Sequence, residues 1–482
     1  MSAAGPAGVG QQGGAAGADF DALIELVTST VAPDTWAENG GGEAEIRPFP
    51  TGVWLDPAGV VISANNDSAE RPSGSRAGRF ADPSPAASGD SDARRPAAMR
   101  CVSLPRLEAE IARRIEAGEP LDEAMLTLAG LQRAEWLCLL PAGADGRAGD
   151  VVIAGPAGDW RVDPDRRLVS TETGRAVVRL DDLLTLLRRE ASRPGRPLGC
   201  AITPRQEALA AAQAELDKTA GAPIPARGRD AWLENLRRSV GQQDVDVWGV
   251  DPATNAARVL VEADRHMKQI GLGEAPSIDA VPSYLDRVAE RVRDGQPAPP
   301  MSVLRWWFAA GYDAIHRDAD ATSFRLVGSG VRVLSENELL TLRGERVHTG
   351  ESDEPTEGFA DDFTKHFDEL CAVYAVYSEL RNVFDLAVLA ALVQSESLVE
   401  RSGWRPKLFF EADALPTPRL RHARRVDTMA TLRVVGRRNL LAAVSGGAWL
   451  EPSAIARSDK GLTADAPPAP AVNHGGWWWD AP

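Results

Sequence analysis

The sequence predicts an α+β protein made of two mixed α/β units, a small N-terminal module and a disordered linker. Apolar residues at three- and four-residue steps alternate with short runs of β-branched and aromatic residues, patterns typical of helices and strands respectively. A chain of 482 residues is also longer than one hydrophobic core usually serves. Helices that alternate with strands in this way pack as mixed layers.

Three segments are expected before the main fold begins. Residues 1–18 are rich in Gly, Ala and Gln and lack the basic start and apolar centre of a signal peptide, so we expect a disordered tail. Residues 19–63 predict a small module with a helix over 20–36 and short strands after it. Residues 64–98 contain almost no large apolar residue. They are expected to form a disordered linker because they cannot bury enough surface to fold.

Two larger units follow, and a tail over 458–482 ends in a run of three tryptophans. The first unit, 99–217, is expected to contain helices at 104–117, 121–131, 181–189 and 203–216 and strands at 135–140, 150–154 and 198–202. The second unit, 230–457, is expected to contain helices at 231–240, 255–273 and 282–293, and strands at 245–250, 304–308, 323–327, 331–334, 420–425, 431–435 and 440–450.

The longest helical pattern in the chain covers about 357–396 and is rich in aromatic residues. Its apolar side chains step by three and four without a break: Phe359, Phe363, Phe367, Leu370, Tyr374, Tyr377, Leu380, Phe384, Val388 and Ala391. This spacing predicts one continuous helix of about ten turns.

Composition and charge exclude several kinds of partner. The formal net charge of −16 disfavours nucleic acid and anionic membrane surfaces, which both need a basic footprint. No apolar run is long enough to span a bilayer, so we expect a soluble protein, cytoplasmic by default. The four cysteines form no CxxC pair, which excludes the usual zinc spacings and a dense disulfide framework. No metal or cofactor is predicted.

A polar set on the helix at 255–273 is the first candidate site. It comprises Glu262, Asp264, Arg265, His266 and Lys268. Glu262 and His266 lie four residues apart on one helix face, as do Asp264 and Lys268, so a carboxylate could work with a base in acid–base catalysis. A solvated face with ion pairs between successive turns is the simpler interpretation and is favoured.

Three polar residues interrupt the apolar stripe of the long helix: Arg381, Asn382 and Asp385. If buried, they must be paired or hydrogen-bonded, because an unpaired buried charge is costly. We expect an interior polar network in which they bond to Asp264 or Arg265. Asp362 and His366, four residues apart, could begin a metal site, but nothing nearby supplies further ligands and a structural role is favoured.

Motifs for common chemistries are absent, whereas aromatic runs are frequent. The sequence has no GxxxxGK[ST], no GxSxG and no HExxH, and thus no pattern for a phosphate loop, a nucleophile elbow or a zinc protease helix. Five tryptophans could form a surface for a protein partner: Trp306, Trp307, Trp477, Trp478 and Trp479. Core packing is favoured for the first two, and docking of the tail on its own chain for the last three.

Several stretches resemble a bacterial family of unknown function (DUF1598) that is associated with planctomycetes. They are TVAPDTW, GVWLDPAGV, VSLPRLE, LAGLQR, DVVIAGPAGDW, TGRAVVRLDDLL, RVLVEADRHMKQIGLG, LRWWF, DDFTKHFDELCAVYAVYSELRNVFDLAVLAAL and GGWWWD. Residues 256–392 are also loosely similar to a segment of large bacterial surface proteins. The resemblance implies no activity. It does imply an exported or envelope location as the alternative to the cytoplasm.

Together these observations favour a non-catalytic structural or protein-interaction protein. The alternative is an enzyme, a metal-independent hydrolase that uses polar residues of the 230–457 unit. A deep cleft that exposes Asp264, His266 and Arg381 together would favour the enzyme. Burial of the same groups in pairs would favour the non-catalytic protein.

Overall fold

The structure is a computed structural model that falls into two compact units, Met1–Ile62 and Ser63–Pro482. It describes residues 45–49, 52–56, 92–140, 149–205, 211, 226–297, 299, 303–340, 346–420, 424–435, 438–457 and 476–481. In the first unit, β1 (Glu45–Phe49) and β2 (Gly52–Asp56) form an antiparallel hairpin. The tail predicted over 1–18 and the helix predicted over 20–36 lie outside the described residues.

The described part of the Ser63–Pro482 unit includes the last residues of the predicted linker. Most of the expected linker lies outside the described residues, and residues 92–98 lie within them. They contain a 3-10 helix, η4 (Asp92–Arg94), and the start of β3 (Ala97–Ser103). Ala93 is buried, so the folded unit includes the last residues assigned to the linker.

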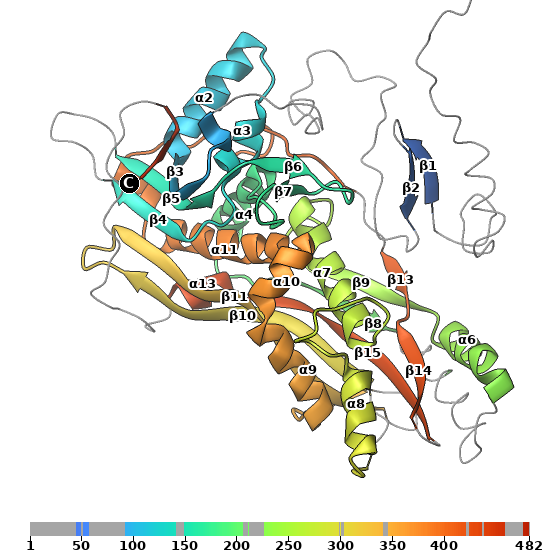
Figure 1. Cartoon of the computed structure of the whole chain (residues 1–482). Helices are drawn as coiled ribbons and strands as arrows, with labels where there is room; N and C mark the ends of the chain where they lie inside the picture. Colours follow the sequence, from blue (N-terminus) through green and yellow to red (C-terminus); the bar gives the residue numbers. More distant parts are fainter. Residues whose placement is uncertain are drawn as a thin grey trace, which may run out of the picture. The chain divides into compact units, whose positions relative to one another are not determined.

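One sheet runs through the second unit (Figure 1) and, among the described residues, has twelve strands. Their path is β13-β9-β8-β15-β10-β11-β4-β5-β3-β16, with β12 on β11 and β14 on β15. The bounds are β3 (Ala97–Ser103), β4 (Trp136–Leu140), β5 (Asp150–Ala157), β8 (Leu198–Pro204), β9 (Gln242–Trp248), β10 (Val303–Arg317), β11 (Ser323–Leu340), β12 (Arg346–His348), β13 (Arg425–Asp427), β14 (Ala430–Val435), β15 (Arg438–Leu450) and β16 (Trp478–Asp480). A separate hairpin joins β6 (Trp160–Val162) to β7 (Leu168–Ser170).

Strands of both predicted α/β units therefore take part in the same sheet. β8, from the first predicted unit, lies between β9 and β15 of the second, and β4 pairs with β11. The two segments share a backbone hydrogen-bond network, so neither buries its strands independently of the other.

The central strands β10, β11 and β15 have two different faces. Trp306 and Phe308 are fully buried on one face, and Trp306 contacts Phe359 of a helix at a ring distance of 4.6 Å. Because side chains alternate along a strand, Arg305 and Trp307 lie on the opposite face. Directly paired residues share a face, so Glu336, which pairs with Arg305, lies there as well.

The helices of the described segments are α2 (Leu104–Ala117), α3 (Glu123–Leu126), α4 (Leu180–Ser192), α6 (Arg229–Val240), α7 (Asn255–Gly271), α8 (Tyr284–Arg293), α9 (Glu354–Lys365), α10 (Phe367–Val373), α11 (Ala375–Ser395), α12 (Leu398–Ser402) and α13 (Pro452–Ala456). In Figure 1, α7, α8 and α9 lie together beside β10, β11 and β15, and contacts of α7 with β15 and of α9 with β11 agree. The Thr254 side chain caps α7 by accepting a hydrogen bond from the Ala257 N–H. None of the described helices is long and apolar enough to cross a membrane.

The prediction of one continuous helix over 357–396 is wrong, because the segment forms three helices, α9, α10 and α11. The chain leaves helical geometry at His366 and again at Tyr374. In a straight helix, Phe363 and Tyr377 would be about 21 Å apart along the axis. Their ring centroids are instead 5.1 Å apart. The breaks thus bring the aromatic residues of one sequence stripe together in a compact cluster, which a straight helix cannot do.

The tryptophan tail docks on its own chain, as the sequence favours. β16 pairs antiparallel with β3 at the end of the sheet. Trp479 is only 4% exposed and packs with Cys101 and Cys138. Asp480 binds Arg100 through two hydrogen bonds of 2.7 and 3.0 Å, and the Arg100 guanidinium lies over the ring of Trp478. The last described residues are therefore part of the fold.

Candidate functional site

The polar residues predicted on the first candidate helix lie largely inside the molecule. Asp264 and Lys268 of α7 are both fully buried, and the Lys268 Nζ donates to Asp264 at 2.5 Å. Burial raises the pKa of Asp264, although Lys268 and the backbone N–H of Gly447 act in the opposite direction. The prediction of a solvated face is therefore wrong for this pair, while the pairing between successive helix turns is confirmed.

Glu262 belongs to an interior network that joins α7 to α11. Its carboxylate accepts hydrogen bonds from Arg258, at 2.7 Å, and from Arg167. Arg167, from the turn between β6 and β7, also donates to Glu379 of α11 at 2.9 Å. Neither Arg167 nor Glu379 was predicted as a site residue from the sequence. Glu379 could have been noticed as a charge within the predicted long helix, next to the buried apolar stripe.

His266 is a partly buried, neutral side chain rather than a charged one. Its Nδ1 lies 2.8 Å from the Tyr377 hydroxyl. Burial and, to a smaller extent, the nearby charge of Arg167 lower the pKa of His266 to about 4, while Asp165 acts in the opposite direction. The imidazole is therefore uncharged near neutral pH. Arg265, the preceding residue on α7, is half-buried.

The three polar residues of α11 have partners on several other elements. Arg381 forms an ion pair of 2.5 Å with Asp368 of α10. Asp385 accepts from Arg133 at 2.7 Å and from the Tyr312 hydroxyl at 2.8 Å. Asn382 donates to the Ala176 carbonyl. They are buried in an interior network, but the bond predicted between Arg381 and Asp264 does not form, because Lys268 lies one turn away from Asp264 on the same helix face.

The two residues weighed as the start of a metal site have separate partners. Asp362 pairs with Arg287 of α8, and the His366 Nδ1 lies 2.8 Å from Glu369. The His366 backbone N–H donates to the Asp362 carbonyl at 3.0 Å, while each side chain has its own partner on another residue.

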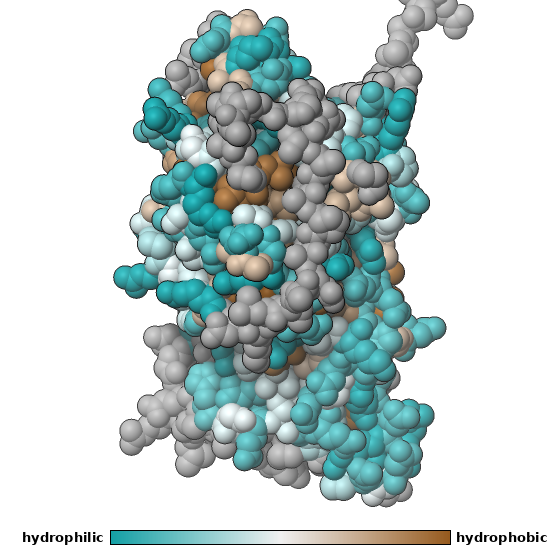
Figure 2. All heavy atoms as spheres, turned by 90° about the vertical axis from the view of Figure 1, so that its left-hand side faces the viewer, coloured by the Kyte–Doolittle hydropathy of each residue, from teal (hydrophilic) through white to brown (hydrophobic). Residues whose placement is uncertain are grey.

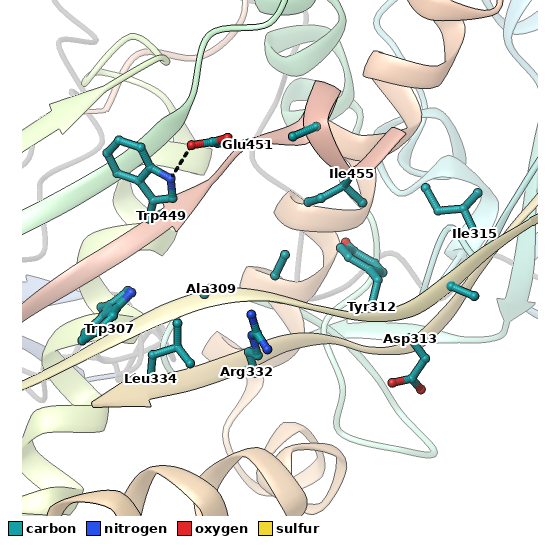
Figure 3. A pocket seen from close by; sticks show the side chains of 13 residues that line it. Trp307, Ala309, Tyr312, Asp313, Ile315, Arg332, Leu334, Trp449, Glu451 and Ile455 are labelled. Atoms are coloured by element: carbon teal, nitrogen blue, oxygen red, sulfur yellow. Dashed lines mark hydrogen bonds between the residues drawn. The ribbon is translucent and has the colours of Figure 1, made fainter. Parts of the chain in front are cut away.

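A groove of about 440 Å³ lies on the opposite side of β10 from Trp306. This volume is within the range of small-ligand sites. Residues of β10, β11, β15 and α13 line it (Figure 3): Trp307, Ala309, Ala310, Tyr312, Asp313, Ala314, Ile315, Arg332, Leu334, Trp449, Glu451, Ala454 and Ile455. Three of these side chains are aromatic: Trp307, Tyr312 and Trp449.

Aromatic and charged side chains are arranged along this groove in a definite order. Figure 3 shows Trp307 and Trp449 at one end, Tyr312 at the other and Arg332 between them. The Trp449 Nε1 donates to Glu451 at 3.1 Å, which fixes the indole beside a carboxylate. Two rings and a guanidinium can stack on a flat or apolar ligand, while the carboxylates can accept hydrogen bonds from a cationic one.

The exposure of Trp449 distinguishes the groove from the rest of the surface. Trp449 is 45% exposed, and among the described residues only Val373 is also a strongly exposed large hydrophobic side chain. The face shown in Figure 2 is mainly hydrophilic, with hydrophobic side chains gathered in its upper half. Trp449 shares the cavity with Trp307 and Tyr312, and concave surfaces lined by aromatic side chains with a few polar groups are typical of ligand sites.

Only one of the five tryptophans predicted as a partner surface lines the groove. Trp306 and Trp479 are buried in the core and cannot touch a partner in the folded state. Trp477 and Trp478 pack partly buried against another apolar cluster of the same chain. Trp307 is the exception, and Trp449, which the sequence analysis did not single out, completes the site with it. Its position in the strand predicted over 440–450 could have indicated this role, because alternate side chains of a strand lie on opposite faces of the sheet.

Comparisons with known proteins give a limited result. A family model described as "Protein of unknown function (DUF1598)" matches residues 200–284, from β8 to the start of α8. The match supports similarity to a family of unknown function over this part of the chain, which includes α7. No curated protein matches the chain, and no solved structure does. The planctomycete association and the similarity to large surface proteins stay predictions.

Proposed function

We propose that the chain is a non-catalytic binding protein whose groove holds an extended peptide segment of a protein partner. The observation that carries this proposal is the exposed Trp449 facing a cavity with Trp307 and Tyr312. Extended segments, especially proline-rich ones, dock in aromatic-lined grooves because little conformational freedom is lost on binding. The carboxylate of Glu451, which lies beside Trp449 (Figure 3), favours a segment that carries a lysine or arginine.

The alternative of a hydrolase is less well supported by the same geometry. Its catalytic groups would come from the polar residues of 230–457. Asp264, Lys268 and Asp385 are fully buried, and each has an oppositely charged partner. A general base must reach its substrate at hydrogen-bond distance, which such buried pairs do not allow.

The experiment is peptide selection from a display library, followed by fluorescence anisotropy on the full chain. We expect the selected peptides to be extended and to combine apolar or proline residues with a basic one. The Trp449→Ala variant should weaken their binding by about 2 kcal/mol, or roughly 30-fold in Kd. Glu451→Gln should weaken basic peptides more than neutral ones.

Val373→Ala is the matched control, since Val373 is the other exposed large hydrophobic side chain and lies on α10. Its binding should equal that of the unchanged protein. A library that yields no peptide, or peptides that bind Trp449→Ala and the unchanged protein equally well, would exclude the groove as a peptide site.

A further inference from the structure

Two glutamates and a histidine converge at the junction of β11 and β12. Glu336 and Glu338 are two residues apart on β11, so their side chains share a face of the sheet. His348 of β12 is the direct cross-strand partner of Glu338. The pairing register of regular strands, rather than the course of a loop, therefore brings the three side chains together.

The distances within this cluster match those of a metal-binding site. The His348 Nδ1 lies 3.2 Å from Glu336 Oε2 and 3.2 Å from Glu338 Oε1, and one ligand atom from each residue lies within 4.8 Å of the others. An ion that holds nitrogen and oxygen ligands at tetrahedral positions separates them by about 3.3 Å. The two nitrogen–oxygen distances correspond to two edges of such a tetrahedron.

We propose that Glu336, Glu338 and His348 bind a divalent transition-metal ion, with zinc as the best match. One imidazole and two carboxylates suit zinc, and three protein ligands leave the fourth tetrahedral position for water. Calcium and magnesium fit less well, since they take six or more ligands, mainly oxygen. The site is independent of the peptide proposed for the groove.

Neighbouring groups hold the carboxylates in the orientation that an ion requires. The Ser445 hydroxyl donates to Glu338 Oε2 at 3.0 Å, and the backbone N–H of Gly350 donates to Glu336 Oε1 at 2.9 Å. In each carboxylate the other oxygen is the one that lies beside His348. Such outer hydrogen bonds fix the ligands of metal sites. Both glutamates are buried while the His348 side chain is 60% exposed, so an ion can enter on the histidine side.

A bound ion would compete with the guanidinium of Arg305 for the carboxylates of Glu336 and Glu338. Its Nη1 lies 2.9 Å from Glu336 Oε2, and its Nε lies 3.8 Å from Glu338 Oε1. The side chain is 31% exposed, and its guanidinium lies 4.3 Å from the ring centroid of Trp307. Arg305 can thus keep a cation–π contact when an ion replaces its positive charge beside the glutamates.

Zinc titration of the untagged, full-length protein in competition with a chromophoric chelator tests the proposal. Substitutions of residues that only hydrogen-bond to a metal ligand lower metal affinity by up to about 100-fold. His348 is proposed as a ligand itself, so we expect His348→Ala to lower the zinc affinity by more than that. His366→Ala is the matched control, because His366 is also paired with one glutamate, Glu369, and should leave zinc binding unchanged. Arg305→Ala should raise the affinity, since it removes the competing charge.

His348→Ala is expected to weaken zinc binding, whereas Arg305→Ala is expected to strengthen it. A general loss of stability would weaken zinc binding in both variants, so it cannot imitate this result. If His348→Ala and His366→Ala bind zinc equally, the cluster is an ion-pair network only. The same conclusion follows if Arg305→Ala binds zinc more weakly than the unchanged protein. Thermal unfolding identifies a variant that fails to fold, and Glu336→Gln, which preserves side-chain volume, is then the second variant and should also lose zinc binding.

Discussion

Asp264 and Lys268 form an ion pair one turn apart on α7, and solvent reaches neither side chain. Removing two charges from water is costly, and their mutual attraction offsets this cost only while both are present. We expect Lys268→Met to destabilise the protein by about 3–5 kcal/mol, because Asp264 is then buried without its cation. Urea denaturation followed by circular dichroism measures this difference.

The double variant Asp264→Leu/Lys268→Met is the control for that experiment. It removes both charges and keeps apolar volume, so it should be markedly more stable than Lys268→Met alone. A double variant that is as unstable as the sum of the two single variants would contradict the pairing.

His266 predicts a specific dependence of stability on acid. Its pKa falls from 6.5 to about 4 on folding, so between these values the unfolded chain binds a proton that the folded chain does not. The contribution of the neutral His266 to the unfolding free energy is fully present above pH 6.5 and is lost as the pH falls toward 4. At about 1.4 kcal/mol per pKa unit, the full loss is about 3 kcal/mol.

Unfolding free energies at pH 7 and pH 4, for the unchanged protein and for His266→Gln, measure this effect. Glutamine can still hydrogen-bond Tyr377 but does not titrate. The decrease in unfolding free energy from pH 7 to pH 4 should be smaller in His266→Gln than in the unchanged protein, by up to about 3 kcal/mol. Equal decreases would show that His266 does not carry the acid sensitivity.

At the scale of elements, β16 closes the end of the sheet at β3. Trp479→Ala removes a side chain that is 4% exposed, and we expect a loss of about 3–5 kcal/mol in unfolding free energy. Trp449→Ala changes the same residue type at an exposed strand position and should cost about 1 kcal/mol or less. Chemical denaturation compares the two. Equal losses would mean that the tail contributes no core packing.

The division of the predicted long helix also belongs to this scale. The periodicity of apolar residues was interpreted correctly, since Phe359, Phe363, Phe367 and Tyr377 are all buried. The stripe specifies only that these side chains face the interior. Whether the interior accepts one straight helix or a folded path depends on β10, which places Phe308 against Phe363 and Tyr377. That information is absent from the segment itself.

At the scale of the whole molecule, the shared sheet predicts cooperative unfolding. β8 forms hydrogen bonds with β9 and β15, and β4 with β5 and β11, so the two predicted α/β units cannot separate without breaking the sheet. We expect hydrogen exchange in β5 and in β15 to report one common transition under denaturant. Two transitions at different denaturant concentrations would show that the units unfold independently.

The groove also depends on the arrangement of the whole molecule. Its lining residues lie between positions 307 and 455 and belong to β10, β11, β15 and α13, with Glu451 between β15 and α13. The sequence identified Trp307 as a possible partner surface because it belongs to an aromatic run. Trp449 stands alone in its strand, and its significance arises only from the parallel pairing of β15 with β10. Similarly, no spacing rule connects Glu336 and Glu338 with His348 before the β11–β12 register is known.

The sequence by itself determined the local structure of this protein. The helix predicted over 104–117 is α2, and the one predicted over 255–273 is α7 except for its last residues, because caps and periodicity act between residues a few positions apart. Only the tertiary structure decided which strands pair, which charges neutralise one another and where tryptophans remain exposed. Many of these outcomes depend on contacts between residues far apart in the sequence, such as Arg167 with Glu379, which are 212 positions apart. Local patterns specify that such groups need partners, but the register of the whole sheet selects them.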